Sequence, residues 1–314
     1  MEKEVELSLL QNWRFQLTLS RSYLDMYMLK RKQFDERIQQ DALKILKSAK
    51  PDWVMRSVTE ARAVFGRWRA YAYGLPERAR VLQLGEALFQ SIGMRLSVAP
   101  HRAMSQSRGA TLDSLDWALN DRGWWEQQFA SIEKLRRSKE QMNALQAALR
   151  WEDVQTGEVY IDFGKEISLT RKTWPSGVSM EVLNAEDSVR MQSWIRGRDI
   201  ARMRLSWLDH LGSAHGSPLT IRFSGLAPKV SYELMIVYGN LRLNGASRLS
   251  VNGVHEIHPH QRGPEPAEPL YFTLPARVND SGVLEFKWEH LVEKGSLDGL
   301  THVSELRLRK KLNR

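Results

Sequence analysis

Residues 218–224 read Pro-Leu-Thr-Ile-Arg-Phe-Ser and residues 231–238 read Ser-Tyr-Glu-Leu-Met-Ile-Val-Tyr, two stretches in which apolar and polar side chains alternate. Similar stretches follow at Ser247–Val251, Pro269–Leu274, Gly282–Trp288 and His302–Leu308, and Gly, Pro, Asn or Asp separates most of them. Alternation with a period of two residues, punctuated by turn-forming residues, is typical of an all-β sandwich or barrel.

The strand pattern begins soon after Trp151. Glu158-Val-Tyr-Ile-Asp-Phe163 predicts a first strand that Gly164 closes. Weaker strand candidates occupy Glu166–Thr170, Val178–Leu183, Arg190–Trp194 and Ala201–Trp207. We therefore predict an antiparallel β-sandwich domain over residues 151–314.

The first half of the chain has the three- and four-residue spacing of helices instead. It predicts helices over residues 4–48, 52–73, 76–97 and 124–149, with Gly74 and Pro76 dividing the second from the third. Residues 98–111 are expected to form a loop and residues 112–121 a short connector. The predicted fold class is therefore α+β in two domains, an α-helical bundle over 1–150 and a β-sandwich over 151–314.

Charge also divides the chain near residue 150. The formal net charge is +9, and residues 1–150 contain 25 Lys and Arg against 17 Asp and Glu, whereas the rest contains 21 against 20. No nucleic-acid-binding motif accompanies the basic residues, so they are interpreted as a solvated helix surface and no nucleic-acid partner is predicted. No apolar run reaches the roughly 18 to 20 residues of a membrane span, and no membrane partner is predicted.

The composition excludes several chemistries but leaves the location of the protein open. The chain has no cysteine, which excludes disulfides, thiolate nucleophiles and cysteine-bound metals. The start Met-Glu-Lys-Glu-Val-Glu-Leu does not resemble a signal peptide. Two locations stay open: extracellular or periplasmic, if the chain is cut from a secreted parent, or else cytoplasmic. No cofactor is predicted, and the sequence neither requires nor excludes a structural Ca²⁺ ion.

Catalytic motifs with a defined spacing are absent from the sequence. A carboxylate pair is the remaining catalytic candidate, because glycosidases use two carboxyl groups. Asp113 and Asp116 lie three residues apart and would share one face of a helix. Helix capping is the favoured interpretation of this pair, and a glycoside-processing enzyme at the domain junction is the alternative.

Histidines cluster in Val254-His-Glu-Ile-His-Pro-His260. In an extended segment His258 and His260 would point to the same side. A metal site with Glu256 is one interpretation. A polar, ligand-facing rim is favoured, because the run leads into a proline-rich loop.

Aromatic and planar polar residues point to a sugar-binding site, since a sugar ring stacks on an aromatic face while polar side chains bind its hydroxyl groups. Trp207 and Trp288 are predicted to be core residues, whereas Trp174 and Trp194 are predicted to be exposed. The candidate ligand-binding residues are Trp194, Arg196, Arg198, Asn240, Arg242, His258, His260 and Arg262.

The second half resembles the C-terminal galactose-binding-like jelly-roll module of large, mostly uncharacterised proteins of polysaccharide processing. The similarity is carried by Gly157–Gly164, Leu219–Leu226, Tyr232–Tyr238, Arg248–Gly253, Gly282–Trp288 and His302–Lys310. The helical half is similar to the region before that module through Leu9–Phe15, Ala87–Ser97 and Leu112–Trp125. One departure is the loop Gly295–Thr301, which is Gly-rich with Asn and Arg in the family.

This resemblance implies a β-sandwich, a sugar-related partner such as a glycan or polysaccharide, and a parent protein longer than this chain. The helical bundle would then be a structural platform or the docking surface for a catalytic domain of that parent. We therefore expect a non-catalytic carbohydrate-binding accessory module. A structural protein–protein interaction module without a small ligand is an alternative, as is the carboxylate enzyme described above.

Overall fold

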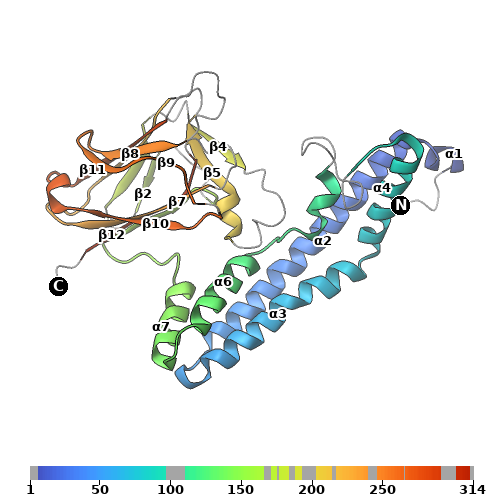
Figure 1. Ribbon diagram of the computed structural model, residues 1–314, viewed down its shortest axis with the longest axis horizontal. Helices are drawn as coiled ribbons and strands as arrows, with labels where there is room; N and C mark the ends of the chain where they lie inside the picture. The colour runs from blue at the N-terminus through green and yellow to red at the C-terminus, as the bar shows by residue number, and fades with distance from the viewer. Residues whose placement is uncertain are drawn as a thin grey trace. The chain divides into compact units, whose positions relative to one another are not determined.

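The computed structural model describes residues 6–96, 110–165, 171–174, 177–183, 188–192, 203–213, 217–239, 246–264, 266–290 and 302–311. Contacts divide these residues into two compact units, one that ends at Leu149 and one that begins at Arg150. Helices form the first unit and antiparallel strands form the second (Figure 1). The predicted α+β class, with a helical region followed by antiparallel sheets, is confirmed.

The helical unit is built around α2, a helix of 35 residues over Trp13–Lys47. The side chain of its N-cap residue, Asn12, accepts a hydrogen bond from a backbone N–H in the first turn. Helices α3 (Val54–Gly74) and α4 (Pro76–Ile92) pack against α2. The other elements are α1 (Leu7–Leu10), η1 (Pro51–Trp53), η2 (Ala110–Asp116), α6 (Arg122–Glu133) and α7 (Ser138–Leu149). Among the described helices, none has both the length and the apolar character of a membrane span.

Three helix predictions are corrected by the structure. The helix predicted over 124–149 is two helices, α6 and α7, because the basic run from Lys134 to Lys139 sets like charges three residues apart. The helix predicted over 76–97 ends at Ile92, because Gly93 adopts a left-handed conformation with φ of 67°. The helix predicted over 4–48 is interrupted between α1 and α2.

A buried polar network fixes the segment between η2 and α6 to α2. Arg31 and Asp35 are fully buried and form an ion pair of 3.2 Å. Asp35 also pairs with Arg122 at 2.7 Å. Arg31 donates further hydrogen bonds to the carbonyl oxygens of Leu115 (3.1 Å) and Trp117 (3.2 Å). The segment that crosses α2 therefore supplies partners to both charges, while Nε of Arg31 and Oδ1 of Asp35 stay buried without a hydrogen bond.

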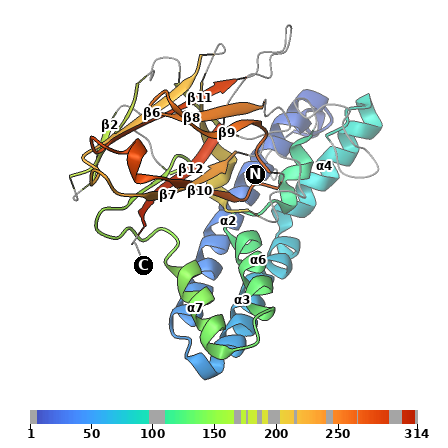
Figure 2. The same ribbon diagram turned by 60° about the vertical axis from the view of Figure 1, so that its left-hand side comes forward.

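The second unit is a sandwich of two sheets, each with six strands in the described residues. Sheet A has the order β10-β7-β12-β5-β4, with β1 paired to β12 beside this path, and sheet B has the order β2-β3-β6-β11-β8-β9. Figure 2 shows β7, β10 and β12 in one layer and β6, β8 and β11 in the other. The strands are β1 (Val159–Asp162), β2 (Arg171–Thr173), β3 (Ser179–Val182), β4 (Ser188–Gln192), β5 (Asp209–Ser213), β6 (Leu219–Ser224), β7 (Tyr232–Tyr238), β8 (Ser247–Val251), β9 (His255–Gln261), β10 (Pro269–Leu274), β11 (Val283–His290) and β12 (His302–Lys310).

The alternating residues of these strands fill the core between the sheets. Phe223 of β6, Ile236 of β7 and Phe286 of β11 belong to one apolar cluster and are fully buried. Trp288 and Trp207, both predicted as core residues, are buried at 0% and 2% exposure. Trp288 lies in the cluster between the sheets.

Other predictions for this half are corrected. Residues Leu205–Leu208 form a 3-10 helix, η4, rather than part of a strand over Ala201–Trp207. Strand β5 had no predicted counterpart, because its sequence Asp-His-Leu-Gly-Ser lacks β-branched and aromatic residues. Trp174, predicted to be exposed, is half-buried and its ring lies 6.4 Å from that of Phe223.

Gly282 gives a direct test of the close packing between two connections of the sandwich. Its φ is +74°, and a Cβ atom there would lie 2.4 Å from the carbonyl oxygen of Leu226. We expect Gly282→Ala to lower the free energy of unfolding of this unit by about 3 kcal/mol, from the combined cost of a left-handed alanine and overpacking. Gly253→Ala is the matched control, since φ is +69° but no atom lies within 4 Å, and about 1 kcal/mol is expected. Equal losses in urea unfolding would contradict the contact argument.

Candidate functional site

Five of the predicted ligand-binding residues, Trp194, Arg196, Arg198, Asn240 and Arg242, lie outside the described residues. The strands that precede them show from which end of the sandwich each segment departs. β7 ends at Tyr238, which pairs with Val303 at the start of β12. β9 ends at Gln261, which pairs with Ser247 at the start of β8. The ends of β7 and β9 therefore lie at one end of the sandwich, which we call the β7–β9 end.

Strand β4 ends at the opposite end of the sandwich. Gln192 pairs with Asp209 at the start of β5, whereas Ser213 at the end of β5 lies near the start of β12. Trp194, Arg196 and Arg198 therefore follow a strand that ends away from the β7–β9 end. Of the described residues, Arg262 thus follows a strand that ends at the β7–β9 end, whereas β4 ends at the other.

His258 lies within a buried chain of hydrogen bonds at this edge of the core. The indole N–H of Trp288 donates to the hydroxyl oxygen of Tyr238 over 2.9 Å, and this hydroxyl donates to His258 Nε2 over 2.6 Å. His258 Nδ1 in turn donates to the carbonyl oxygen of Pro259 over 2.7 Å. Burial lowers the pKa of His258. Both ring nitrogens are thus used inside the protein.

His260 and Arg262 are exposed, in contrast to His258. The expectation that His258 and His260 point to the same side is therefore corrected. The pairing of β9 with β8 is irregular at two places. One lies between the pairs Ser247–Gln261 and Leu249–His258. The other lies between the pairs Leu249–His258 and Ser250–Glu256. A bulge re-aims the side chains that follow it, so strict alternation is lost there. His260 and Arg262 remain as polar groups at the rim of the β7–β9 end.

The base of the same end holds a serine–histidine pair that sequence reasoning missed. Ser213, at the end of β5, lies with its Oγ 3.0 Å from Nε2 of His290, at the end of β11. Burial lowers the pKa of His290. Ser213 is fully buried and His290 is half-buried. No spacing in the sequence could have signalled it, because the two residues belong to different sheets.

A second buried cluster lies on the outer face of sheet A. Glu305 of β12 is fully buried, and its Oε1 accepts a hydrogen bond of 2.6 Å from the indole N–H of Trp151. Its Oε2 accepts hydrogen bonds from the indole N–H of Trp207 and, at 3.4 Å, from Arg204. Burial raises the pKa of the Glu305 carboxyl. These contacts attach Trp151, which precedes β1, and Arg204 and Trp207, which precede β5, to the outer face of sheet A.

Asp162 of β1 is paired in register with Glu305, and burial raises the pKa of its carboxyl as well. Two adjacent carboxyl groups with raised pKa values are a pattern that catalytic sites use. Arg204 lies beside both and also donates to the hydroxyl of Tyr160 over 2.9 Å. Because Glu305 and Asp162 are buried and held by Arg204, the arrangement fits structural attachment of a covering segment.

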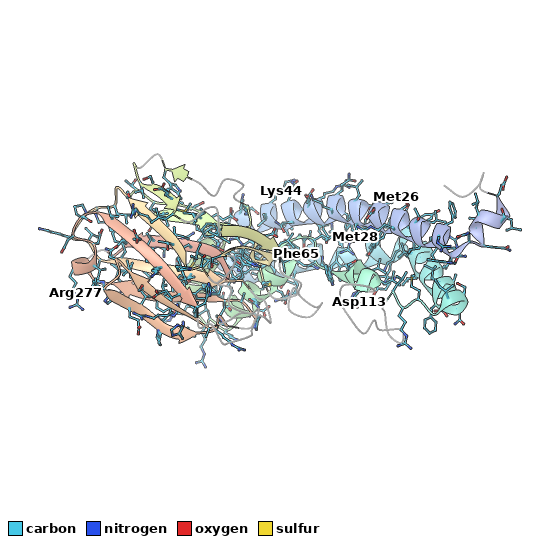
Figure 3. The ribbon with its side chains drawn as sticks, turned by 90° about the horizontal axis from the view of Figure 1, so that it is seen from above. Met26, Met28, Lys44, Phe65, Asp113 and Arg277 are labelled. Carbon is cyan, nitrogen blue, oxygen red and sulfur yellow. The ribbon has the colours of Figure 1, made fainter. Side chains whose placement is uncertain are left out.

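The two catalytic candidates of the sequence, Asp113 and Asp116, are both exposed and lie on η2 of the helical unit. Asp113 is labelled in Figure 3. Asp116 forms an ion pair of 3.3 Å with Arg78, whose guanidinium lies 3.9 Å from the ring centre of Tyr73. The Tyr73 hydroxyl donates to Asp116 over 3.4 Å. Asp116 thus has the contacts of an ion pair that joins η2 to α4. Among the residues that the structure describes, no group of three or more His, Asp or Glu side chains could hold a metal ion.

No protein-family model and no curated protein sequence matches this chain. Among solved structures, it is similar to the plant receptor-like kinase FER, at a TM-score of 0.34 and 10% identity over 49% of this chain and 42% of that one. It is also similar to the GH26-CBM35 β-(1,4)-mannanase of Podospora anserina, at 0.32 and 12% over 51% and 29%. The β-glucuronidase of Bacteroides uniformis matches at 0.34 and 13%, over 49% and 18%. The chain thus spans less than half of each of these structures.

Proposed function

We propose that this chain is a non-catalytic carbohydrate-binding module, an accessory part of a larger polysaccharide-processing protein. The binding site is placed at the β7–β9 end of the sandwich, on the connections that contain Asn240, Arg242 and Arg262. The observation that carries the proposal is the register of β7 and β9, which brings both strand ends to one end of the sandwich. Amide and guanidinium groups are the planar donors that recognise sugar hydroxyl groups.

The surroundings of that end support a binding role. His260 and Arg262 are exposed at its rim, whereas the fully satisfied chain from Trp288 to His258 makes its base rigid. A rigid scaffold with polar connections at one end is a common arrangement for recognition. Asp116 is the carboxylate of the enzymatic alternative. It pairs with Arg78 and accepts a hydrogen bond from Tyr73, and it is not part of the proposed binding site.

Binding to a panel of plant, algal and microbial polysaccharides tests the proposal. We expect at least one polysaccharide to bind, and we expect Arg262→Ala or the pair Asn240→Ala and Arg242→Ala to weaken its affinity roughly tenfold or more, since hydrogen bonds from charged groups are lost. Arg277→Ala is the matched control, because Arg277 is exposed on η5 (Ala276–Val278; Figure 3). η5 follows the end of β10, which pairs with the start of β7 and so lies opposite the β7–β9 end. No binding across the panel would refute the function, and equal affinities of the Arg262 and Arg277 variants would refute the site.

A further inference from the structure

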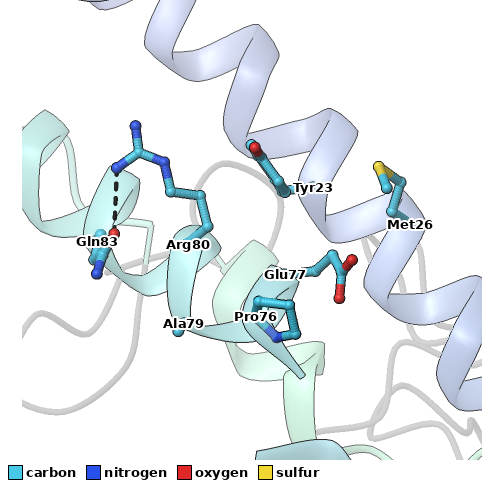
Figure 4. A pocket seen from close by; sticks show the side chains of 7 residues that line it. All are labelled: Tyr23, Met26, Pro76, Glu77, Ala79, Arg80 and Gln83. Carbon is cyan, nitrogen blue, oxygen red and sulfur yellow. Dashed lines mark hydrogen bonds between the residues drawn. The ribbon is translucent and has the colours of Figure 1, made fainter. Parts of the chain in front are cut away.

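A groove of about 540 Å³ lies between α2 and α4 of the helical unit, and Figure 4 shows Tyr23 of α2 on one side with α4 on the other. Both charged side chains that line this groove are engaged within the unit. Glu77 pairs with Lys30 at 2.6 Å, and Arg80 donates a hydrogen bond to Gln83 over 3.2 Å. The groove therefore selects no class of ligand by charge.

Strand β10 lies at an edge of sheet A. It pairs with β7 over all six of its residues without a register shift, and among the described strands none pairs with its other side. A strand at an edge presents a row of unpaired backbone N–H and C=O groups, which is a template for a further strand. Leu270 and Phe272 pack against the core of the sandwich but are only partly buried. An added strand would cover both side chains.

The other strands with an open side carry features that oppose the addition of a strand. β2 contains Arg171 and Lys172, and β4 contains Arg190. β9 contains Pro259, and its pairing with β8 is irregular at two places. The four residues of β1 are all buried. Charges, prolines, bulges and coverage are the devices with which proteins protect the edge of a sheet.

β10 lacks these devices after its first residue. It reads Pro-Leu-Tyr-Phe-Thr-Leu over residues 269–274 and contains no charged residue. Tyr271, which alternates with the core-facing residues, is 54% exposed on the outer face of sheet A. Lys311, which follows β12, donates to the Thr273 hydroxyl over 2.8 Å, so its charge is engaged on that face. An uncharged and regular edge of this kind favours association with another strand.

The residue pattern of β10 is symmetric about Tyr271, which fits a second copy of the same strand. A two-fold axis between antiparallel strands makes each contact reciprocal, and residues directly opposite each other share a face of the sheet. When Tyr271 lies opposite its own copy, Leu270 of each strand lies opposite Phe272 of the other. The two partly buried core residues thus meet apolar partners. Because the strand contains no charge, no like charges are brought together.

We propose that two copies of this chain associate through β10, which joins their A sheets into one continuous antiparallel sheet. Pro269 and Pro275 bound the pairing segment, because proline lacks the N–H group that a longer ladder needs. The interface is therefore small, below roughly 1,200 Å², and a weak dimer that depends on protein concentration is expected. Glycan binding at the β7–β9 end is not required for this association.

Sedimentation velocity of the full chain over a wide range of protein concentrations tests the association, and a monomer–dimer equilibrium is expected. Tyr271→Lys is expected to raise the dissociation constant of the dimer about tenfold or more, because two lysines replace an aromatic pair and repel each other across the two-fold axis. Tyr271→Glu alone is expected to have the same effect. An equimolar mixture of these two variants is expected to regain dimers, since opposite charges then face each other.

Val254→Lys is the matched control, because it adds the same charge at an apolar residue of the sandwich that is 87% exposed and lies outside β10. Its dissociation constant is expected to equal that of the parent chain. A parent chain that stays monomeric at every concentration would overturn the proposal and leave the edge to a strand of another protein. Equal dissociation constants of Tyr271→Lys and Val254→Lys would overturn the assignment to β10. A mixture of the Tyr271→Lys and Tyr271→Glu variants that stays monomeric would overturn the pairing of Tyr271 with its own copy.

Discussion

Replacing Asp35 by alanine is expected to destabilise the helical unit by about 3 to 5 kcal/mol, the cost of removing one partner from a buried ion pair. Asp35 and Arg31 have no exposed surface, so water cannot replace the lost carboxylate beside Arg31. Arg122 loses its carboxylate partner in the same step. The segment between η2 and α6 would also lose a direct attachment, because the backbone N–H of Leu119 donates to Oδ2 of Asp35 over 3.3 Å.

Urea unfolding followed by circular dichroism at 222 nm measures this change, since the helices dominate that signal. Glu36→Ala is the control on the neighbouring residue, because Glu36 faces solvent and its contact with Lys32 is 3.9 Å. Less than about 0.5 kcal/mol is expected for the control, as for other exposed ion pairs. A loss for Asp35→Ala that equals that of Glu36→Ala would show that the buried network does not support the fold.

Lowering the pH from 7 to 4 is expected to destabilise the β-sandwich by about 3 kcal/mol through His210 alone. Burial lowers the pKa of His210 to about 4, from about 6.5 in an unfolded chain. Between these values the unfolded chain binds the proton and the folded unit does not, so stability present above pH 6.5 is lost as the pH falls toward 4. A difference of roughly 2.5 pKa units corresponds to about 3 kcal/mol. His258 and His290, whose pKa values burial also lowers, add to the loss.

The indole N–H signal of Trp288 in two-dimensional NMR reports this unit specifically, because Trp288 lies in the sandwich core. Urea titrations at pH 7, 5.5 and 4 give the pH dependence of unfolding for the chain and for His210→Gln. The variant is expected to lose less stability on acidification than the parent chain, whatever its stability at pH 7. His260→Gln, at an exposed position, is expected to keep the full dependence. An unchanged pH slope in His210→Gln would contradict the assignment.

The strands that sequence predicted well are those whose apolar face is buried against the other sheet. β6 alternates from Leu219 to Ser224 and its burial alternates with it, so pattern and structure coincide. β12 shows what the pattern hides, because Glu305, a polar position of its alternating stretch, is fully buried. Alternation reveals that two faces differ and does not reveal what covers the polar one. The covering residues, Trp151 and Arg204, lie far from Glu305 in sequence and carry no spacing signal.

The candidate site was predictable to a smaller extent. Residue type singled out Arg262 and His260, and both are exposed. His258 has the same residue type and a neighbouring position, yet Tyr238 and Pro259 occupy its nitrogens. The register shifts of β9 decide between these outcomes, and such shifts depend on pairing with β8 rather than on the sequence of β9 alone. The groove beside Glu77 arises from two helices that are separate in sequence, so only the fold brings its residues together.

The hydrogen bond from Trp151 to Glu305 has a practical consequence for dividing the chain. A fragment meant to carry the sandwich alone would, by its strand pattern, begin near Gly157, just before β1. Such a fragment lacks Trp151, which donates to Glu305, and Glu152, which pairs with Arg204 and Lys165. The buried carboxylate of Glu305 and the buried guanidinium of Arg204 would then each lose one partner. The cleavage point that preserves the sandwich lies between Leu149 and Trp151, several residues before its first strand.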